Sequence, residues 1–474
     1  MPHIQGMDRQ AVVRFPPSLD EYIAAENPVR FIDAFVDSLD LESLGFARVK
    51  AADTGRPPYH PGDLLKLYIY GYLNRIRSSR RLEKEAGRNV EVMWLLKKLK
   101  PDHKTISDFR KDNLEPLKRV CREFTVLCKR LELFGGELAA IDGSKFKAVN
   151  SRRRNYNKKK VERALKRIEE KIEGYLSEMG EGDRQEAEGG RLTEEELKDK
   201  ISQLLVRQEK YEQLQQELES GASQVSLTDP GSRSMPVGMG TDVCYNVQIG
   251  VDSKHKLIVE HKVTNAVTDQ GQLASMALRT KETLGVESLD VVADKGYYDG
   301  QQVKACEEEG IRPYISKPQT SANKKRGLYT KADFTYDAEG DIYRCPHGAE
   351  LTFRFETEEK GRHIRYYATT ACRDCPFKKQ CTRNKRGRRI TRWVDEHILE
   401  AMAQRVQERP DIMKERQAIV EHPFGTMKRA MQQGCFLLRG LVKVAAEMSL
   451  TVLAYNIKRV ITILGVEKMI AALA

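Results

Sequence analysis

The chain has 474 residues, of which 81 are Lys or Arg and 69 are Asp or Glu, so it carries a formal net charge of +12. This length exceeds what a single hydrophobic core usually supports, which predicts several structural units. No apolar run is long enough to span a bilayer, the polar start does not resemble a signal peptide, and nine cysteines, an odd number, fit a reducing cytoplasm better than a disulfide framework.

The excess of positive charge favours a polyanionic partner, because neutralising phosphates releases counterions. An ordinary basic soluble protein is the alternative. Two dense basic runs, at 152–160 and 378–389, favour nucleic acid over that alternative.

Residues 1–135 are predicted to be helical. Apolar residues recur at helical spacing in four stretches: 31–44, 61–76, 89–99 and 103–131. Pro61 stands where a first helical turn would begin. Short helices with basic edges suit a DNA-binding bundle of the helix-turn-helix kind, and a helical dimerisation or packing domain is the alternative.

Residues 158–220 show heptad periodicity in two arms. The apolar or aromatic positions alternate spacings of four and three, and an acidic, glycine-containing break separates the arms. An antiparallel helical hairpin inserted into the core is the economical model, and pairing between subunits is the alternative. The positions are Val161, Leu165, Ile168, Ile172, Tyr175 and Met179, then Leu197, Ile201, Leu204, Gln208, Tyr211, Gln215 and Leu218.

The pattern of the residues outside these two regions predicts a mixed α/β sheet with flanking helices. Strand patterns occupy five segments: 137–149, 244–252, 256–264, 288–294 and 311–316. Helical patterns occupy 269–285 and 299–310, and helices return from Glu396 onward. A second insertion, residues 319–393, is polar, basic and strand-like.

Three carboxylates stand out. Asp142 and Asp294 each end an apolar, β-branched run and are followed within two residues by Gly, which predicts buried strands delivering a carboxylate to a sheet edge. Glu421 lies in a helix-like stretch with Lys428 two turns later on the same face. Three such carboxylates would suit a pair of Mg²⁺ or Mn²⁺ ions acting on a phosphodiester. Lys428 could hold a DNA phosphate as a point charge, and Arg416 could do so through its fork.

Two features limit this interpretation. A single Asp at a strand end is more often a turn or cap residue. Pro423 and Gly425 both disfavour a helix interior, so either the helix containing Glu421 is kinked, or a new helix begins with Pro423 in its first turn.

Four cysteines lie in the second insertion: Cys345, Cys372, Cys375 and Cys381. A C-x2-C pair with two further cysteines can close a tetrahedral Zn²⁺ site. The alternative is four reduced, unliganded thiols. A zinc site would organise an insertion that is poor in apolar residues.

The ordered motifs together resemble a bacterial insertion-sequence transposase of the DDE class, with an N-terminal helical domain and a ribonuclease-H-like core. The resemblance covers nearly the whole chain. The matching segments are LLKLYIYGYLNRIRSSRRLEKE, PDHKTISDFR, IDGSKFKAVNSR, CYNVQ, VADKGYYD, VEHPFGTMKR and LAYNIKR. One departure is that many relatives read Tyr-x2-Arg-x3-Glu-x6-Lys. Here Met413 stands at the Tyr position, and four residues separate Arg416 from Glu421.

The resemblance implies that Asp142, Asp294 and Glu421 form a catalytic, metal-binding triad. It implies cleavage at terminal inverted repeats of double-stranded DNA, strand transfer into target DNA, and a homodimeric synaptic complex on the bacterial nucleoid, with no membrane association. We expect a DNA-binding domain over 1–135 and a catalytic domain over 136–474, and DNA contacts from Arg152 and Arg153. A nuclease of the same fold without strand transfer, and a catalytically inactive DNA-binding derivative, are the alternatives.

Overall fold

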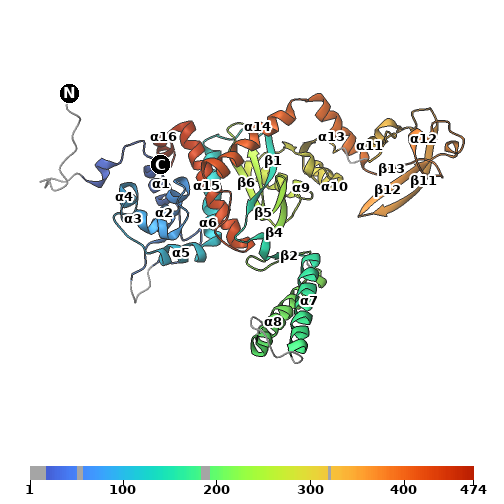
Figure 1. Cartoon of the computed structure of the whole chain (residues 1–474). Coiled ribbons are helices and arrows are strands. Elements are labelled where there is room, and N and C mark those ends of the chain that lie inside the picture. Colours follow the sequence, from blue (N-terminus) through green and yellow to red (C-terminus); the bar gives the residue numbers. More distant parts are fainter. Residues whose placement is uncertain (1–17, 51–56, 183–192, 222, 319–321, 474) are drawn as a thin grey trace, which may run out of the picture.

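The computed structural model describes residues 18–50, 57–182, 193–221, 223–318 and 322–473. The start of the predicted N-terminal unit, the break of the predicted helical hairpin and the first residues of the second insertion lie outside these ranges. A central sheet is flanked on one side by the N-terminal helices and on the other by a separate small sheet (Figure 1). None of the helices in the described part of the chain has the length and apolar character of a membrane span.

The N-terminal region is a bundle of short helices with local start signals. Pro61 occupies the first position of its helix, and the Asp102 carboxylate caps another by accepting from the amides of Lys104 and Thr105 at 2.9 Å. The helices are α1 (Pro28–Asp37), α2 (Pro61–Leu73), α3 (Ser79–Ala86), α4 (Val90–Leu95), α5 (His103–Asp112) and α6 (Leu114–Arg130).

The predicted helical stretch 103–131 is two helices, because Asn113 leaves the helical conformation with φ −119° and ψ 38°. Its side chain donates to the Phe109 carbonyl at 2.7 Å and accepts from the Ala47 amide at 2.8 Å. These local bonds compete with the helical ladder and hold the bend between α5 and α6.

The central sheet contains the five predicted strands and one more. Its strands are β1 (Leu138–Lys147), β4 (Arg233–Val237), β5 (Gly240–Asp252), β6 (Ile258–Thr264), β7 (Leu289–Ala293) and β8 (Ile311–Ile315). The order is β4-β5-β1-β7-β8, with β6 also paired to β5. β5 is antiparallel to β1, β4 and β6, whereas β1, β7 and β8 run parallel.

Helices cover both faces of this sheet. One hydrophobic core joins the N-terminal helices to one face of the sheet and to the C-terminal helices, and a second core lies between the other face and α9, α10 and α13. The covering helices are α9 (Leu273–Leu284), α10 (Gly300–Glu308), α13 (Glu396–Glu408), α14 (Ile412–Gly425), α15 (Leu441–Leu464) and α16 (Val466–Ala471). The N-terminal helices therefore complete their packing against the rest of the chain.

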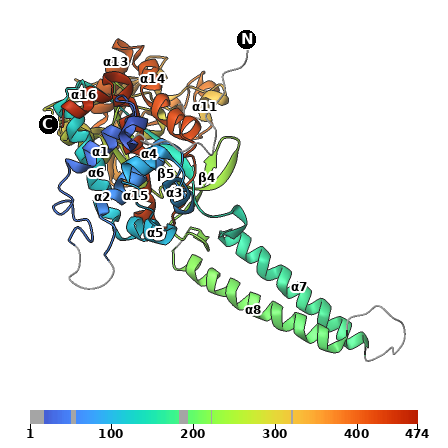
Figure 2. The same ribbon diagram turned by 90° about the vertical axis from the view of Figure 1, so that its left-hand side faces the viewer.

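A pair of long antiparallel helices, α7 (Lys158–Gly182) and α8 (Glu194–Glu219), projects from this body (Figure 2). The pair leaves the body through a short ladder between β2 (Asn155–Tyr156) and β3 (Val225–Ser226). Heptad positions face inward along the pair, with Val161, Leu197 and Leu204 buried. A small cluster at its base is separate from the main core.

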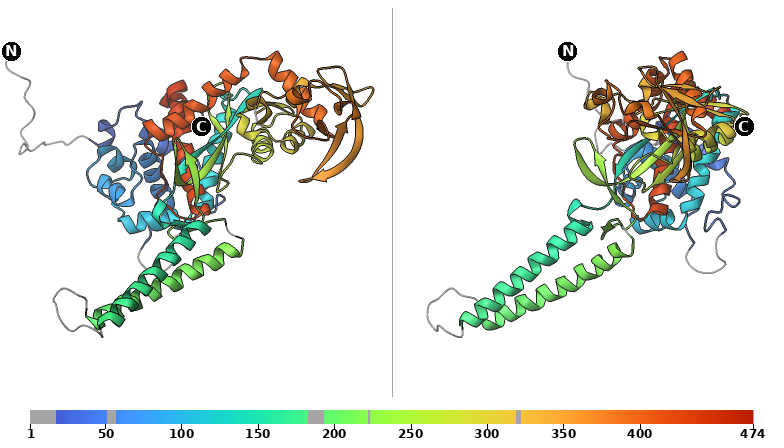
Figure 3. Two further views of the ribbon diagram at one scale, coloured as in Figure 1. Left: turned by 45° about the vertical axis from the view of Figure 1, so that its right-hand side comes forward. Right: turned by 90° about the vertical axis from the view of Figure 1, so that its right-hand side faces the viewer.

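A second sheet lies at the opposite end from the N-terminal helices (Figure 3). Its core is small: Phe334, Tyr343, Leu351, Tyr367 and Ile390. The strands are β9 (Thr335–Asp337), β10 (Ile342–Arg344), β11 (Glu350–Glu359), β12 (Arg362–Ala368) and β13 (Arg389–Trp393), all antiparallel. The short helices α11 (Ala322–Lys325) and α12 (Lys378–Cys381) flank it.

Candidate active site

Two aspartates lie side by side on neighbouring strands of the central sheet. Asp294 directly follows β7 as predicted, but Asp142 lies within β1, which continues to Lys147 because its second half pairs with β5. β1 and β7 are parallel neighbours, and their last paired residues are Ile141 and Ala293. The next residue of each chain segment is Asp142 or Asp294. Because this register fixes both backbones, the two carboxylates emerge from adjacent positions, with Asp142 partly buried and Asp294 exposed.

Asp142 is short of positive charge. The pKa of its carboxyl group is raised to about 6, chiefly by burial and to a smaller extent by the nearby Asp269 and Asp294. Arg416 opposes this rise with its Nη1 atom 3.4 Å from Oδ2, as does a hydrogen bond from the Gly143 amide at 2.8 Å. A site of this kind would be stabilised by an added cation.

Glu421 lies on α14, the helix that packs against β1 and β7. The helix continues through Pro423 and ends in a π-helical turn, Thr426–Ala430. The alternative in which a new helix begins at Pro423 is therefore wrong. Pro423 lacks the amide that would donate to a carbonyl four residues earlier, so the ladder is locally interrupted. Glu421 is exposed and accepts from Gln417 Nε2 at 2.6 Å.

Across the described residues, no three His, Cys, Asp or Glu side chains are close enough together to hold a metal ion. Asp142 and Asp294 lie on neighbouring parallel strands, but the Glu421 carboxylate is bonded within its own helix instead of completing the set. The chemistry of the donors nevertheless fits a hard divalent cation, since all three offer carboxylate oxygens.

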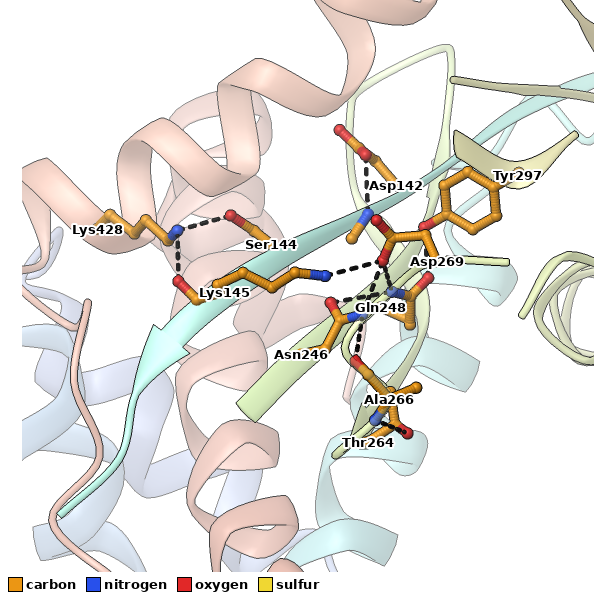
Figure 4. A network of polar contacts seen from close by, with 11 residues as sticks. Asp142, Ser144, Lys145, Asn246, Gln248, Thr264, Ala266, Asp269, Tyr297 and Lys428 are labelled. Carbon is orange, nitrogen blue, oxygen red and sulfur yellow. Dashed lines mark hydrogen bonds and ion pairs between the residues drawn. The ribbon is translucent and has the colours of Figure 1, made fainter. Parts of the chain in front are cut away.

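Lys428 faces β1, the strand that carries Asp142. Its Nζ donates to Ser144 Oγ at 2.6 Å and to the Lys145 carbonyl at 2.9 Å, and it lies 4.7 Å from the centre of the Phe146 ring (Figure 4). Burial lowers the pKa of Lys428. The ammonium is thus anchored next to the site, two residues along the strand from Asp142.

The other predicted DNA-contact residues have different surroundings. Arg416 forms an ion pair with the nearby Asp142 carboxylate. The prediction was that its forked guanidinium would hold a DNA phosphate. Arg152 and Arg153 lie in the exposed turn between β1 and α7, and Arg152 Nε is 3.6 Å from an oxygen of Asp242.

Sequence reasoning missed Asp269, in the loop between β6 and α9. Its Oδ1 accepts from Asn246 Nδ2 at 2.7 Å, Gln248 Nε2 at 2.8 Å and Lys145 Nζ at 3.2 Å (Figure 4). The available signal was the pair of amides in the otherwise apolar strand CYNVQIGV, since buried amides require partners.

The four cysteines of the second insertion come together around one small cavity of about 30 Å³, next to the second sheet. All four are free thiols of intermediate exposure: Cys345, Cys372, Cys375 and Cys381. They are not close enough to coordinate one ion, as the absence of any metal-holding group in the described residues shows. Zinc therefore stays a prediction.

Comparison with protein families gives two matches. Residues 17–112 match the family described as Transposase domain (DUF772), and residues 344–461 match the family described as Transposase DDE domain. Both matches are to transposase families, and each covers less than half of the chain. The resemblance to DDE transposases inferred from the motifs is confirmed. The second match includes Glu421 and Lys428, whereas Asp142 and Asp294 lie outside the matched residues.

A cryo-EM structure of a piggyBac transposase synaptic complex with hairpin DNA is similar to this chain with a TM-score of 0.31 and 9% sequence identity. The similarity covers 94% of this chain and 79% of that one. A comparison with curated proteins gives no match.

Proposed function

We propose that this protein cuts DNA at the ends of an insertion element and transfers the freed strands into target DNA. Asp142, Asp294 and Glu421 are the proposed catalytic residues. The observation that carries the proposal is the pairing of Ile141 with Ala293, because it sets the first two carboxylates beside each other on parallel strands. The two matches to transposase families support this class of reaction, and the second of them includes Glu421.

The sheet topology supports a ribonuclease-H-like core. Strands β6, β5 and β1 are consecutive antiparallel neighbours, followed by β7 and β8 in parallel with β1. In this proposal residues 136–474 form the catalytic domain. The helical pair, 158–220, is inserted between β1 and β5, and the second sheet, 319–393, between β8 and α13.

The proposed cofactor is Mg²⁺ or Mn²⁺, held by Asp142, Asp294 and, after a change of side-chain conformation, Glu421. When bound, it would supply Lewis-acid stabilisation of the charge that develops on phosphate oxygens. In its absence Arg416 partly neutralises Asp142. If a bound cation neutralised Asp142, the Arg416 guanidinium would become available to a DNA phosphate. Lys428 holds a second positive charge beside β1.

The reaction has two displacements. In the first, a water oxygen bonds to phosphorus at the element end, the bond to the 3′ oxygen breaks, and that oxygen takes a proton. In the second, the freed 3′-hydroxyl bonds to a target phosphorus and displaces a target 3′ oxygen, while its own proton is transferred away. The chain's positive charges, including Arg152 and Arg153, hold terminal-repeat and target duplexes, and we propose a homodimer that pairs the two ends.

The test is Asp294→Asn with labelled element ends and Mg²⁺. We expect the variant to bind ends like the unmodified protein and to lose cleavage, because the amide is a far poorer ligand than a carboxylate. Unchanged cleavage would remove Asp294 from the active site. Joined products formed by the unmodified protein distinguish a transposase from a nuclease that only cuts.

The cysteine cavity is the proposed place for a structural Zn²⁺, reached when the four thiols close around the ion. The support is that Cys345, Cys372, Cys375 and Cys381 line one cavity beside a sheet with only five buried core residues. We expect about one equivalent of zinc in metal analysis of the purified protein. The Cys375→Ser variant should lose the bound zinc. The control is Cys306→Ser, which changes a buried thiol outside the cavity and should retain the zinc. A metal-free protein with an unchanged melting temperature in chelator would contradict the assignment.

A further inference from the structure

We propose that a buried polar network, made of Asn246, Gln248, Asp269 and Tyr297, fixes the relative positions of Asp142 and Asp294 and thereby sets the affinity for the divalent cation. These four are positioning residues that act through the two aspartates. The inference rests on the proposed function and adds to it a role for side chains outside the triad.

The first part of the network joins β5 to the loop between β6 and α9. Asn246 and Gln248 are fully buried on β5, and both donate to Oδ1 of Asp269. Asn246 Nδ2 also donates to the Ala266 carbonyl in that loop at 3.2 Å, and Gln248 Nε2 donates to Asn246 Oδ1 at 3.1 Å. With these bonds the buried amides hold the loop rigidly against the strand.

The network lies directly beside the residue after Asp142. In the β1–β5 register Gly143 pairs with Gln248. A Cβ atom on Gly143 would lie 2.2 Å from Gln248 Nε2 and 2.5 Å from Asp269 Oδ1, so both side chains would have to shift to admit it. The backbone that presents Asp142 is therefore in close contact with the network.

Tyr297 connects the network to the second aspartate. It is 1% exposed and ends the 3-10 turn Lys295–Tyr297, and its amide donates to the Asp294 carbonyl at 2.9 Å. Its hydroxyl donates to Gln248 Oε1 (Figure 4). The turn that carries Asp294 is thus bonded to the strand that pairs with Gly143.

These contacts form a continuous chain from Asp294, through Tyr297 and Gln248, to the backbone beside Asp142. Two carboxylates on neighbouring parallel strands repel each other, and their closeness becomes favourable only when a cation binds between them. Groups that orient metal ligands through hydrogen bonds typically alter metal affinity about ten- to hundredfold when they are removed. A network that only satisfied buried polar groups would affect stability without a specific effect on cation binding.

The experiment measures Mn²⁺ dissociation by electron paramagnetic resonance on the full chain. We expect Tyr297→Phe to bind Mn²⁺ about tenfold or more weakly, because the Asp294 turn loses its anchor. Binding to element ends should be unchanged, since Tyr297 is buried. The matched control is Tyr298→Phe, the neighbouring phenol whose hydroxyl is not part of the network, and it should bind Mn²⁺ normally.

A second variant distinguishes a specific loss of cation affinity from a folding defect of the first. Asp269→Asn removes the charge opposite Lys145 with little change in shape, and it should also weaken Mn²⁺ binding. Normal Mn²⁺ affinity in both variants, with Asp294→Asn unable to bind Mn²⁺, would overturn the network's role and leave the proposed function intact. Normal Mn²⁺ affinity in Asp294→Asn itself would overturn the proposed metal site, and the network's role with it.

Discussion

Asp142 shows how one residue can be unfavourable for the fold and useful for chemistry. Its carboxyl group is partly buried, near two other carboxylates, and its closest positive charge is Arg416 at 3.4 Å. Burial is the largest cause of the rise in its pKa to about 6. A carboxylate held in this state costs stability at neutral pH and gains most from a cation.

This reasoning predicts that Asp142→Asn stabilises the metal-free protein. In the folded state the pKa of Asp142 lies above its ordinary value of 3.8, so the native state binds the extra proton and its stability falls as pH rises from about 4 to about 6. The Asp142→Asn variant does not lose stability in this way, because its side chain does not titrate. Its free energy of unfolding at about pH 7.5 should exceed that of the unmodified protein by up to about 3 kcal/mol, and the difference should vanish near pH 4.

Urea denaturation in chelator at several pH values measures this difference. Glu421→Gln is the matched control, the same kind of substitution at an exposed carboxyl group. An Asp142→Asn protein that is less stable than the unmodified protein at neutral pH would contradict the prediction.

The residues of the site differ in how well the amino-acid sequence alone predicts their positions. The strands that carry Asp142 and Asp294 could be predicted because strand patterns are local, and their parallel pairing brings the two residues close together. The predicted end of the first strand at Asp142 was wrong, because pairing with β5 extends β1 to Lys147. Asp269 could not be predicted, because its partners come from two other strands of the sheet: Lys145 on β1, and Asn246 and Gln248 on β5. The same holds for Arg416, whose pairing with Asp142 depends on how α14 lies across the sheet.

At the scale of elements, the periodic patterns were reliable and the breaks were not. The five predicted strands and the long helices α7 and α8 are present. The division at Asn113 was missed, since its side-chain bonds involve the distant Ala47. The path of α14 through Pro423 was left open, because packing of the helix on β1 and β7 outweighs a local preference of about 3 kcal/mol.

At the scale of the whole molecule, the N-terminal helices and the central sheet share one core. α15 packs against both α2 and α6, and α16 packs against α1. A buried charge reinforces this link. Glu447 on α15 accepts from the amides of Leu437 and Leu438 at 2.9–3.0 Å and faces Arg77 at 3.5 Å. Arg77 also donates to the Cys435 carbonyl at 2.7 Å.

This shared core predicts cooperative unfolding. Calorimetry should show the N-terminal helices and the central sheet unfolding in a single transition. Glu447→Ala should lower the free energy of unfolding by about 3 kcal/mol or more, because two backbone amides and the half-buried Arg77 lose their buried acceptor. Glu467→Ala, an exposed carboxylate on α16, is the control. Two separate transitions, with only the later one shifted by Glu447→Ala, would show independent domains instead.

The packing of α16 against α1 has a consequence for synthesis of the protein. The N-terminal helices cannot complete the burial of their apolar faces until α15 and α16 have been synthesised, because those helices supply part of the opposing surface. We therefore expect a nascent chain interrupted before α15 to lack a fully folded N-terminal unit.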